Sequence, residues 1–484
     1  MAREPRGVSA VRRYRFFQSV LADALAAFGI LALLFAALAL ALREPWAGFL
    51  AAGASLPVGL LLRRQPPSKT EPGRHETAVT VLLLWAVVSL LTSVPYVVQS
   101  PLSFVDSVFE AVSGFSTTGS TVITKLAELP RSLVLWRAVS QWVGGIGILV
   151  MFVAVFPTLA IAGRQLFLSE SPIFEEQRIA PRLRQIAGVI ITVYGALTVL
   201  CTFGYVLSGL PLFNALAFAF ATVGAGGFSP IDGGFGALHN TTAEWVAIVF
   251  MLLAGVSFPL LFRTARTGLK TLLRNTEFRV YIGVFALASA AIWLTLPGTV
   301  RTVRAVVFHV ISILTSTGFA TLDYTLWPAA PLFLLIGLML VGASVGSAAG
   351  GIKVLRWVLL AKNVGRELKR TLAPRAVLPI TLGKRIIPDA VIRSVIAFVL
   401  LYFATLLAAG FALLFTGLPP AEAFTLALAH ISNTGPAVGM FGPLGSVSAV
   451  PEGGKWVLII TMIAGRLEVV TLFVALTPLW WRHR

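Results

Sequence analysis

Four short stretches of the chain each end in a glycine that follows small or hydroxyl-bearing residues. Glycine leaves no side chain at such a turn, so backbone carbonyl oxygens can point toward a shared centre. Carbonyl and threonine hydroxyl oxygens can together replace the hydration shell of an alkali cation. The sequence offers no His or Cys cluster for a transition metal, and no resident cofactor is expected. The candidate ligands are Thr118, Gly119, Gly226, Gly227, Thr317, Gly318, Thr434 and Gly435.

An apolar segment of about a dozen residues precedes each of the four marker glycines at 119, 227, 318 and 435. These glycines lie 108, 91 and 117 residues apart. A segment of this length is too short to cross a bilayer, so each is expected to form a re-entrant half-helix. The alternative is that these are four chance turns between spans. Four turns at the same place within four matching units argue against this alternative. The segments cover residues 104–112, 212–221, 303–314 and 422–431.

The half-helices also share a position near their start. Asp106, Asn214 and Glu422 each lie 13 residues before their marker glycine, and the third repeat has Ala305 there, beside Arg304. A polar side chain at this point is expected to act as the helix N-cap.

The composition places these segments in a membrane. Of the 484 residues, 57% are hydrophobic and only 12% are charged, with a mean hydropathy of +0.88. A soluble domain carries about 25% charged residues, so an ordinary soluble enzyme and a disordered protein are both excluded. The chain is long enough for ten spans of about 20 residues each. They are expected to begin near residues 20, 46, 78, 134, 186, 244, 280, 331, 390 and 456.

The net charge of +18 is spread unevenly along the chain. With both termini in the cytoplasm, the inside segments hold 29 Lys and Arg residues and the outside segments hold 7. This bias agrees with the positive-inside rule, so the basic residues indicate topology rather than nucleic-acid binding. The densest basic loop, 353–385, is expected to contact anionic lipid or a cytoplasmic partner.

Each repeat then begins and ends in the cytoplasm, and such parallel repeats are related by an axis along the membrane normal. We therefore expect an all-α polytopic membrane protein with four membrane–pore-loop–membrane repeats around a pseudo-fourfold axis. Two extra N-terminal transmembrane helices precede the repeats. The expected units are 1–76 for the N-terminal pair, then 77–163, 164–270, 271–370 and 371–484 for the four repeats.

The span after the third glycine loop contains a run of ten mostly small residues at 342–351. Glycine costs about 1 kcal/mol per helical position relative to alanine, so this run is expected to break the helix. A break at membrane depth is tolerated beside a pore, whereas a small-residue face for helix packing is the alternative. We expect a mobile intramembrane loop before Lys353, with hinges at Gly346, Ser347, Gly350 and Gly351.

Arg466 lies within the last apolar span. A charge at the centre of a bilayer costs about 2.5–3.5 kcal/mol on insertion scales, so this side chain should face a pore or a carboxylate. Glu468 is two residues away and projects from another helix face, which makes it a poor partner. A buried ion pair with another repeat is the structural alternative.

Several acidic residues are expected on the outer side. Their field could concentrate cations near an entrance, although capping and solvation are favoured for any single one of them. The residues are Asp106, Glu110, Asp232, Asp323, Glu422 and Glu452.

With these motifs in order, the chain resembles the Trk/Ktr/HKT superfamily of potassium transporters, and most closely its TrkH branch. The resemblance covers about 90% of the sequence, and its motifs are specific in combination. The matching stretches are SGFSTTG at 113–119, QWVGGIG at 141–147, GGFS at 226–229, STGFAT at 316–321, GSAAGGIK at 346–353, ISNTGP at 431–436 and GRLE at 465–468.

The resemblance implies a potassium filter at the four marker glycines, a gating loop below it at 346–353, and Arg466 as a positive barrier in the pore. It also implies a homodimer, a cytoplasmic nucleotide-binding regulatory subunit and a bacterial inner membrane. One departure is the second loop, VGAGG at 223–227, where the family usually carries Ser and Thr before the two glycines. The marker of this loop is Gly226 or Gly227. Phe228 favours Gly227, because Phe319 likewise follows Gly318.

Three other classes of function compete with a potassium pore. A symporter coupling potassium to sodium or protons would use intramembrane carboxylates, and Glu110, Glu244 and Glu468 are few and near span ends. A membrane enzyme would need a nucleophile or acid–base constellation, and none is present in the sequence, nor is the phosphate-binding GxxxxGK[ST] motif of an ATPase. A structural scaffold would not need four matched loops. We therefore expect a transporter that is not an enzyme.

Overall fold

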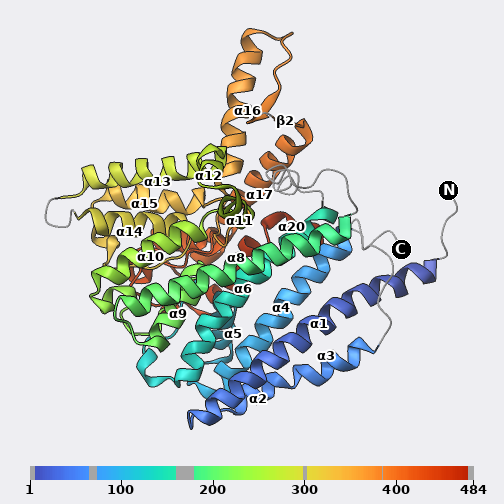
Figure 1. The fold of residues 1–484 in the computed structure, drawn as a ribbon, viewed down its shortest axis with the longest axis vertical. Coiled ribbons are helices and arrows are strands. Elements are labelled where there is room, and N and C mark those ends of the chain that lie inside the picture. Colours follow the sequence, from blue (N-terminus) through green and yellow to red (C-terminus); the bar gives the residue numbers. More distant parts are fainter. Residues whose placement is uncertain (1–5, 65–73, 160–178, 298–301, 384, 478–484) are drawn as a thin grey trace.

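The computed structural model describes residues 6–64, 74–159, 179–297, 302–383 and 385–477, and nearly all of its regular structure is helical (Figure 1). The expectation that both termini are cytoplasmic, and the boundary between residues 163 and 164, lie outside the described residues. The helices are α1 (Arg6–Ala41), α2 (Ala47–Gly53), α3 (Ser55–Arg63), α4 (Arg74–Gln99), α5 (Phe104–Phe115), α6 (Arg131–Leu159), α8 (Ile179–Leu207), α9 (Leu212–Val223), α10 (Thr241–Ala254), α11 (Phe258–Thr267), α12 (Lys270–Arg274), α13 (Thr276–Thr295), α14 (Val303–Leu314), α15 (Ala329–Val341), α16 (Val354–Leu372), α17 (Asp389–Leu414), α18 (Pro420–Ile431), α19 (Glu452–Arg466) and α20 (Val469–Leu476).

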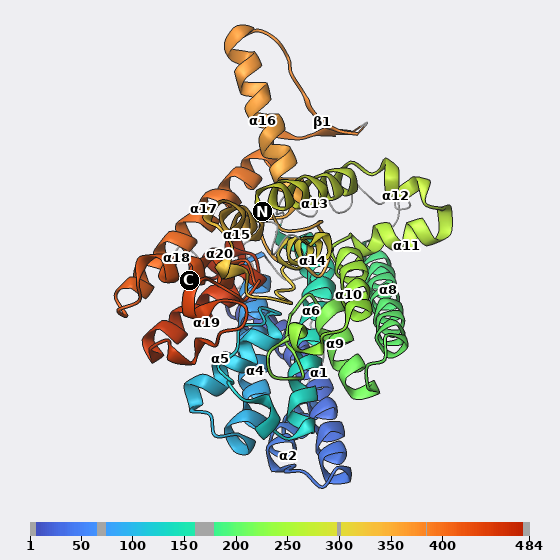
Figure 2. The ribbon, with the colours of Figure 1, turned by 90° about the vertical axis from the view of Figure 1, so that its left-hand side faces the viewer.

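The four half-helices α5, α9, α14 and α18 have twelve residues each. Each packs against the helices before and after it in the chain: α5 between α4 and α6, α9 between α8 and α10, α14 between α13 and α15, and α18 between α17 and α19. The four units follow one another around a common centre (Figure 2). This arrangement confirms the expected all-α repeat architecture.

Three half-helices begin at the residue that the sequence predicted, and α18 begins two residues earlier, at Pro420. The N-cap residues are Ser103, Pro211, Thr302 and Pro419, and the Ser103 hydroxyl accepts a hydrogen bond from the Asp106 amide at 3.1 Å. The prediction of N-caps at Asp106, Asn214 and Glu422 was therefore wrong, because these residues occupy the third helical position. At Asp106 and Glu422, a carboxylate in the first turn still interacts favourably with the helix dipole.

The ten expected spans take three forms in the described residues. Six are single helices long and apolar enough to cross a membrane, starting at Phe17, Glu76, Arg131, Gln185, Thr276 and Asp389. Two are bent pairs: α10 turns by 99° into α11, and α19 turns by 107° into α20. The remaining two are shorter, Ala47–Arg63, which divides into α2 and α3, and Ala329–Val341.

The N-terminal helices lie at one side of the repeats (Figure 1). Phe35 of α1 and Phe49 of α2 enclose Trp136 of α6 at ring-centroid distances of 5.0 and 5.5 Å. This aromatic cluster is buried and attaches the N-terminal helices to the first repeat. At the other end of the molecule, α16 and the antiparallel hairpin of β1 (Ile380–Leu382) and β2 (Arg385–Ile387) project away from the helical body.

Candidate functional site

The four marker glycines meet at one cavity. Gly119, Gly227, Gly318 and Gly435 all line a space of about 240 Å³ that opens between the segments following the half-helices. The loops that meet there are defined as loop 1 (residues 116–120), loop 2 (224–228), loop 3 (315–319) and loop 4 (432–436). The predicted marker glycines of all four repeats are therefore brought together.

The four loops share one backbone conformation. The marker glycines have φ angles of 81°, 76°, 79° and 93°, in a region that side chains disfavour. The residue two positions earlier is also left-handed in each loop: Thr117, Ala225, Ser316 and Asn433 have φ between 52° and 55°. Because Ala225 occupies this place in loop 2, the residue equivalent to the other markers is Gly227, and Gly226 corresponds to the three threonines.

The loops are arranged as a closed ring. At each marker glycine, a side chain would collide with the carbonyl oxygen preceding the marker of the next loop. Gly119 lies against the Gly226 oxygen, and the same relation joins loops 2 and 3, loops 3 and 4, and loops 4 and 1. The glycines are thus required for the close approach, and four backbone carbonyl groups surround one axis.

A repeated set of hydrogen bonds holds each loop to the end of its half-helix. The residue before each marker donates its backbone N–H to a carbonyl oxygen five residues earlier, at 2.8–2.9 Å in all four repeats. In loops 1, 3 and 4, the hydroxyl three residues before the marker glycine (position −3) also bonds to the hydroxyl of the residue just before the marker (position −1). These bonds join Ser116 with Thr118, Thr315 with Thr317, and Ser432 with Thr434, at 2.7–2.9 Å. The three candidate threonine hydroxyls are therefore engaged within their own loops.

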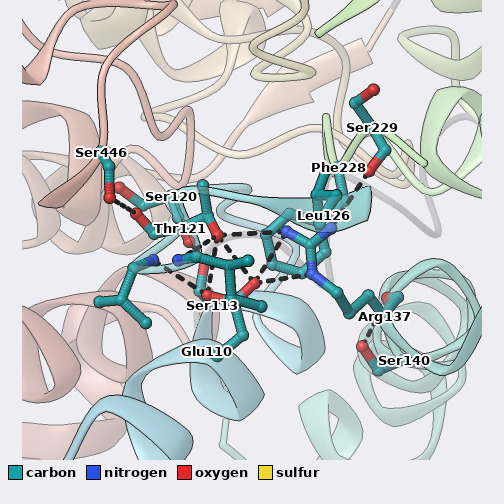
Figure 3. A network of polar contacts seen from close by, with 12 residues as sticks. Glu110, Ser113, Ser120, Thr121, Leu126, Arg137, Ser140, Phe228, Ser229 and Ser446 are labelled. Atoms are coloured by element: carbon teal, nitrogen blue, oxygen red, sulfur yellow. Dashed lines mark hydrogen bonds and ion pairs between the residues drawn. The ribbon is translucent and has the colours of Figure 1, made fainter. Parts of the chain in front are cut away.

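A buried ion pair joins the outer edges of loops 1 and 2 (Figure 3). Glu110 of α5 and Arg137 of α6 are 2.8 Å apart, with their side chains 0% and 2% exposed. Arg137 also donates to the Ser229 carbonyl at 3.1 Å and to the Thr121 hydroxyl at 3.2 Å. Its guanidinium lies 4.1 Å from the centre of the Phe228 ring. The pair therefore holds residues that stand one or two positions after the two marker glycines.

Three of the other outer acidic residues, Asp106, Asp232 and Asp323, also make structural contacts. Asp106 pairs with Lys455 at 2.6 Å. Asp232 accepts hydrogen bonds from the Leu126 and Ala127 amides, and Asp323 accepts from Thr325. These contacts favour the capping interpretation of the carboxylates over a free negative field at the entrance.

The run at 342–351 is not helical: α15 ends at Val341 and α16 begins at Val354. This 342–353 segment lies against loops 3 and 4, because the Gly350 amide donates to the Ser316 hydroxyl at 2.5 Å and a side chain on Gly350 would collide with the Ser432 carbonyl oxygen. Gly346, Gly351 and Lys353 all have positive φ. The Ser347 hydroxyl donates to the Ser344 carbonyl at 2.6 Å.

The break between α10 and α11, which belongs to the second repeat, also binds the 342–353 segment. The Ser344 amide donates to the Gly255 carbonyl at 3.0 Å, and the Phe258 amide donates to the Gly346 carbonyl at 3.1 Å. The segment is thus attached by backbone hydrogen bonds that no side-chain pattern could reveal. Gly255 and Pro259 are the sequence signals that could have located this break.

Arg466 ends α19 at the 107° bend and is 4% exposed. Its guanidinium donates to the Ala348 carbonyl of the 342–353 segment at 3.1 Å, and two of its nitrogens have no partner among the described residues. Glu468 instead pairs with Arg356 of α16 at 2.5 Å. Lys353 donates to the adjacent Ala349 carbonyl. The structure thus brings Arg466 and the predicted gate residues together next to loops 3 and 4.

Sequence reasoning missed the residues that brace the loops from other helices. Arg137 was counted only as an outside charge and Gln141 only as part of a motif. Both lie on α6 four residues apart, a spacing that places them on one helical face. In the described residues no group of three or more His, Cys, Asp or Glu residues is placed to hold a metal.

Known proteins resemble this chain over most of its length. The family model TrkH, described as a cation transport protein, matches residues 51–297 and 297–479. The Trk system potassium uptake protein TrkH of Halomonas elongata is 36% identical over 417 residues, which is 83% of this chain and 84% of that protein. The protein of that name from Escherichia coli K12 is 33% identical over 430 residues, 86% of this chain and 89% of that protein.

A solved structure has the same fold. The crystal structure of the potassium transporter TrkH from Vibrio parahaemolyticus matches with a TM-score of 0.87 at 30% sequence identity. The match covers 97% of this chain and 100% of that chain.

Proposed function

Because the chain belongs to the TrkH family of cation transport proteins, we propose that it takes up potassium through a pore whose selectivity filter is the ring of loops 1 to 4. The observation that carries the proposal is that four matched loops, each with a left-handed glycine, surround one cavity. Rings of backbone carbonyls can replace the hydration shell of potassium. The relatives are named for potassium uptake.

The 342–353 segment is proposed as the gate. It packs against loops 3 and 4 and contains several residues with positive φ, including Gly346 and Gly351. Arg466 donates to this segment through Ala348, and two of its nitrogens have no partner in the described part of the chain, which supports a positive barrier below the filter. Rearrangement of the segment would move both the segment itself, which obstructs the proposed pore, and the Arg466 guanidinium that is bonded to the segment.

A cytoplasmic nucleotide-binding regulatory subunit is proposed to act on α16, which continues directly from the gate. This helix projects from the body and exposes Leu368 and Leu372 beside Lys369 and Arg370. A mixed apolar and basic surface suits a protein partner or an anionic lipid surface. The assembly is proposed to be a homodimer in a bacterial inner membrane, with both termini cytoplasmic.

Carboxylate-coupled symport receives less support. Glu110, Glu244 and Glu468 each pair with an arginine, so each carboxylate already has a fixed cation as its partner. These residues are therefore poorly suited to pick up and release a coupling ion during each cycle.

Flux through proteoliposomes tests the proposal. The purified chain, with and without a nucleotide-binding partner, should carry rubidium or potassium down a gradient, and sodium should compete weakly. Absence of flux in both conditions would refute the pore, and a requirement for a sodium or proton gradient would favour symport instead.

A further inference from the structure

Loop 2 differs from the other three loops where they have their hydroxyl bridge. Loops 1, 3 and 4 carry Ser or Thr at both the −3 and −1 positions, and these hydroxyls bond to each other. Loop 2 has Gly224 and Gly226 at these positions. Something other than its own side chains must therefore fix the conformation of loop 2.

The close approach of α6 explains why side chains are missing there. A Cβ on Gly145 of α6 would lie 3.2 Å from the Gly224 Cα, and a Cβ on Gly224 would lie 3.1 Å from the Gln141 carbonyl oxygen. A Cβ on Gly226 would lie 2.6 Å from Oε1 of Gln141. The space that a loop side chain would fill is occupied by the helix and by the Gln141 carboxamide.

The Gln141 carboxamide makes two hydrogen bonds, one on each side of the marker Gly227. Its Nε2 donates to the Gly226 carbonyl at 2.5 Å, and its Oε1 accepts from the Phe228 amide at 3.0 Å. The residue is fully buried. Two bonds in opposite senses also define which end of the amide is the oxygen.

The peptide between Gly226 and Gly227 needs such a restraint more than its counterparts do. In loops 1, 3 and 4 a threonine precedes the marker, whereas here two successive glycines remove the steric barrier to rotation of the peptide plane. The Gly226 oxygen lies against Gly119 in the ring. Rotation of this peptide would therefore remove one carbonyl from the ring.

We propose that Gln141 is a positioning residue for ion selectivity, because its carboxamide replaces the missing hydroxyl bridge of loop 2 and fixes the Gly226 carbonyl. The inference rests on the proposed filter function. It does not make Gln141 an ion ligand, since its two polar atoms face the backbone of the loop.

The fourth repeat provides a matched replacement. Gly144 of α6 and Gly465 of α19 each pack on the carbonyl of the last residue of a half-helix, Phe115 and Ile431. Gln141 and Met462 each stand three residues before one of these glycines, so Met462 is the counterpart of Gln141 in the fourth repeat. Met462 is also fully buried. Methionine has a similar size without the hydrogen-bonding groups, so the same fold accommodates it at this site.

The test compares Gln141→Met with wild type in proteoliposomes, using rubidium and sodium flux as the readout. We expect Gln141→Met to assemble normally and to lose about fivefold in discrimination against sodium, the factor that the lost hydrogen bond to the Gly226 carbonyl is worth. Gln18→Met, at a buried glutamine of α1, is the control and should retain wild-type selectivity. Unchanged selectivity in Gln141→Met would overturn the inference.

A second pair of substitutions, at Gly226 and Gln141, tests the inference if Gln141→Met does not fold. Gly226→Ala should abolish flux because its methyl group meets the carboxamide, and adding Gln141→Ala should restore part of the flux without restoring selectivity. No restoration would count against the contact.

Gly119→Ser distinguishes a failure of the proposed filter from a failure of the proposed role of Gln141. If wild type does not discriminate between the ions, the proposed filter fails. If Gly119→Ser changes selectivity and Gln141→Met does not, only the role of Gln141 fails.

Discussion

Neutralising Glu110 should destabilise the protein more than neutralising any surface carboxylate. Glu110→Gln keeps the shape of the side chain and one oxygen for the Val122 amide, which now donates to Oε2 at 3.1 Å. It removes the charge opposite Arg137, whose side chain is 2% exposed. Among the described residues, Arg137 would retain the Ser229 carbonyl, the Thr121 hydroxyl and the Phe228 ring.

The magnitude follows from burial. Removing one partner of a buried ion pair leaves an uncompensated charge and costs about 3–5 kcal/mol. The Glu244–Arg304 pair is the matched control, since its side chains are 12% and 38% exposed at a separation of 2.7 Å. A partly exposed pair is worth roughly 0–1 kcal/mol, so Glu244→Gln should have a small effect.

The assay is a double-mutant cycle on unfolding temperature, followed in detergent by size-exclusion chromatography after heating. Glu110→Gln should be far less stable than Glu244→Gln, and adding Arg137→Met should recover stability. The coupling should lie in the upper part of the roughly 0.5–3 kcal/mol range for contacting residues. Equal effects of Glu110→Gln and Glu244→Gln, or strict additivity with Arg137→Met, would refute the reasoning.

Three further substitutions separate the filter from the gate. Gly318→Ala should abolish rubidium flux because φ is 79° and the new methyl group meets a backbone carbonyl of loop 4, whereas Gly337→Ala, in open space on α15, should keep wild-type flux. Arg466→Ala should raise flux in the same assay by removing the positive barrier and the bond to the 342–353 segment; unchanged flux in a folded variant would leave Arg466 a structural role only. Glu468→Gln breaks the buried pair with Arg356 and should lower the unfolding temperature without altering potassium over sodium selectivity; altered selectivity would show that this pair reaches the filter.

The sequence predicted the half-helices and their glycines well because both depend on local features. A dozen apolar residues and a left-handed glycine are encoded within about fifteen positions, and the same pattern occurs four times. The N-cap residues of the half-helices were misplaced, in part because Pro211 and Pro419, which carry no side-chain oxygen, occupy two of the N-cap positions.

The sequence could not predict the side-chain contacts between distant helices and loops, for a physical reason. Gln141 and Gly226 are 85 residues apart, and Arg356 and Glu468 are 112 apart. Nothing in a helical period identifies such partners, since they are set by how the repeats close around the axis. The bend after Arg466 was also missed, because Glu468 rather than a glycine adopts positive φ there.

The selectivity of Gly119→Ser tests the central claim most directly, namely that the four glycine loops form a potassium filter. Gly119 has φ of 81° and lies against the Gly226 carbonyl, so a serine there must displace the ring. Wild-type protein in liposomes should carry potassium in strong preference to sodium, and Gly119→Ser should lose much of that preference while remaining folded. Equal preference in the two proteins would contradict the assignment of the filter.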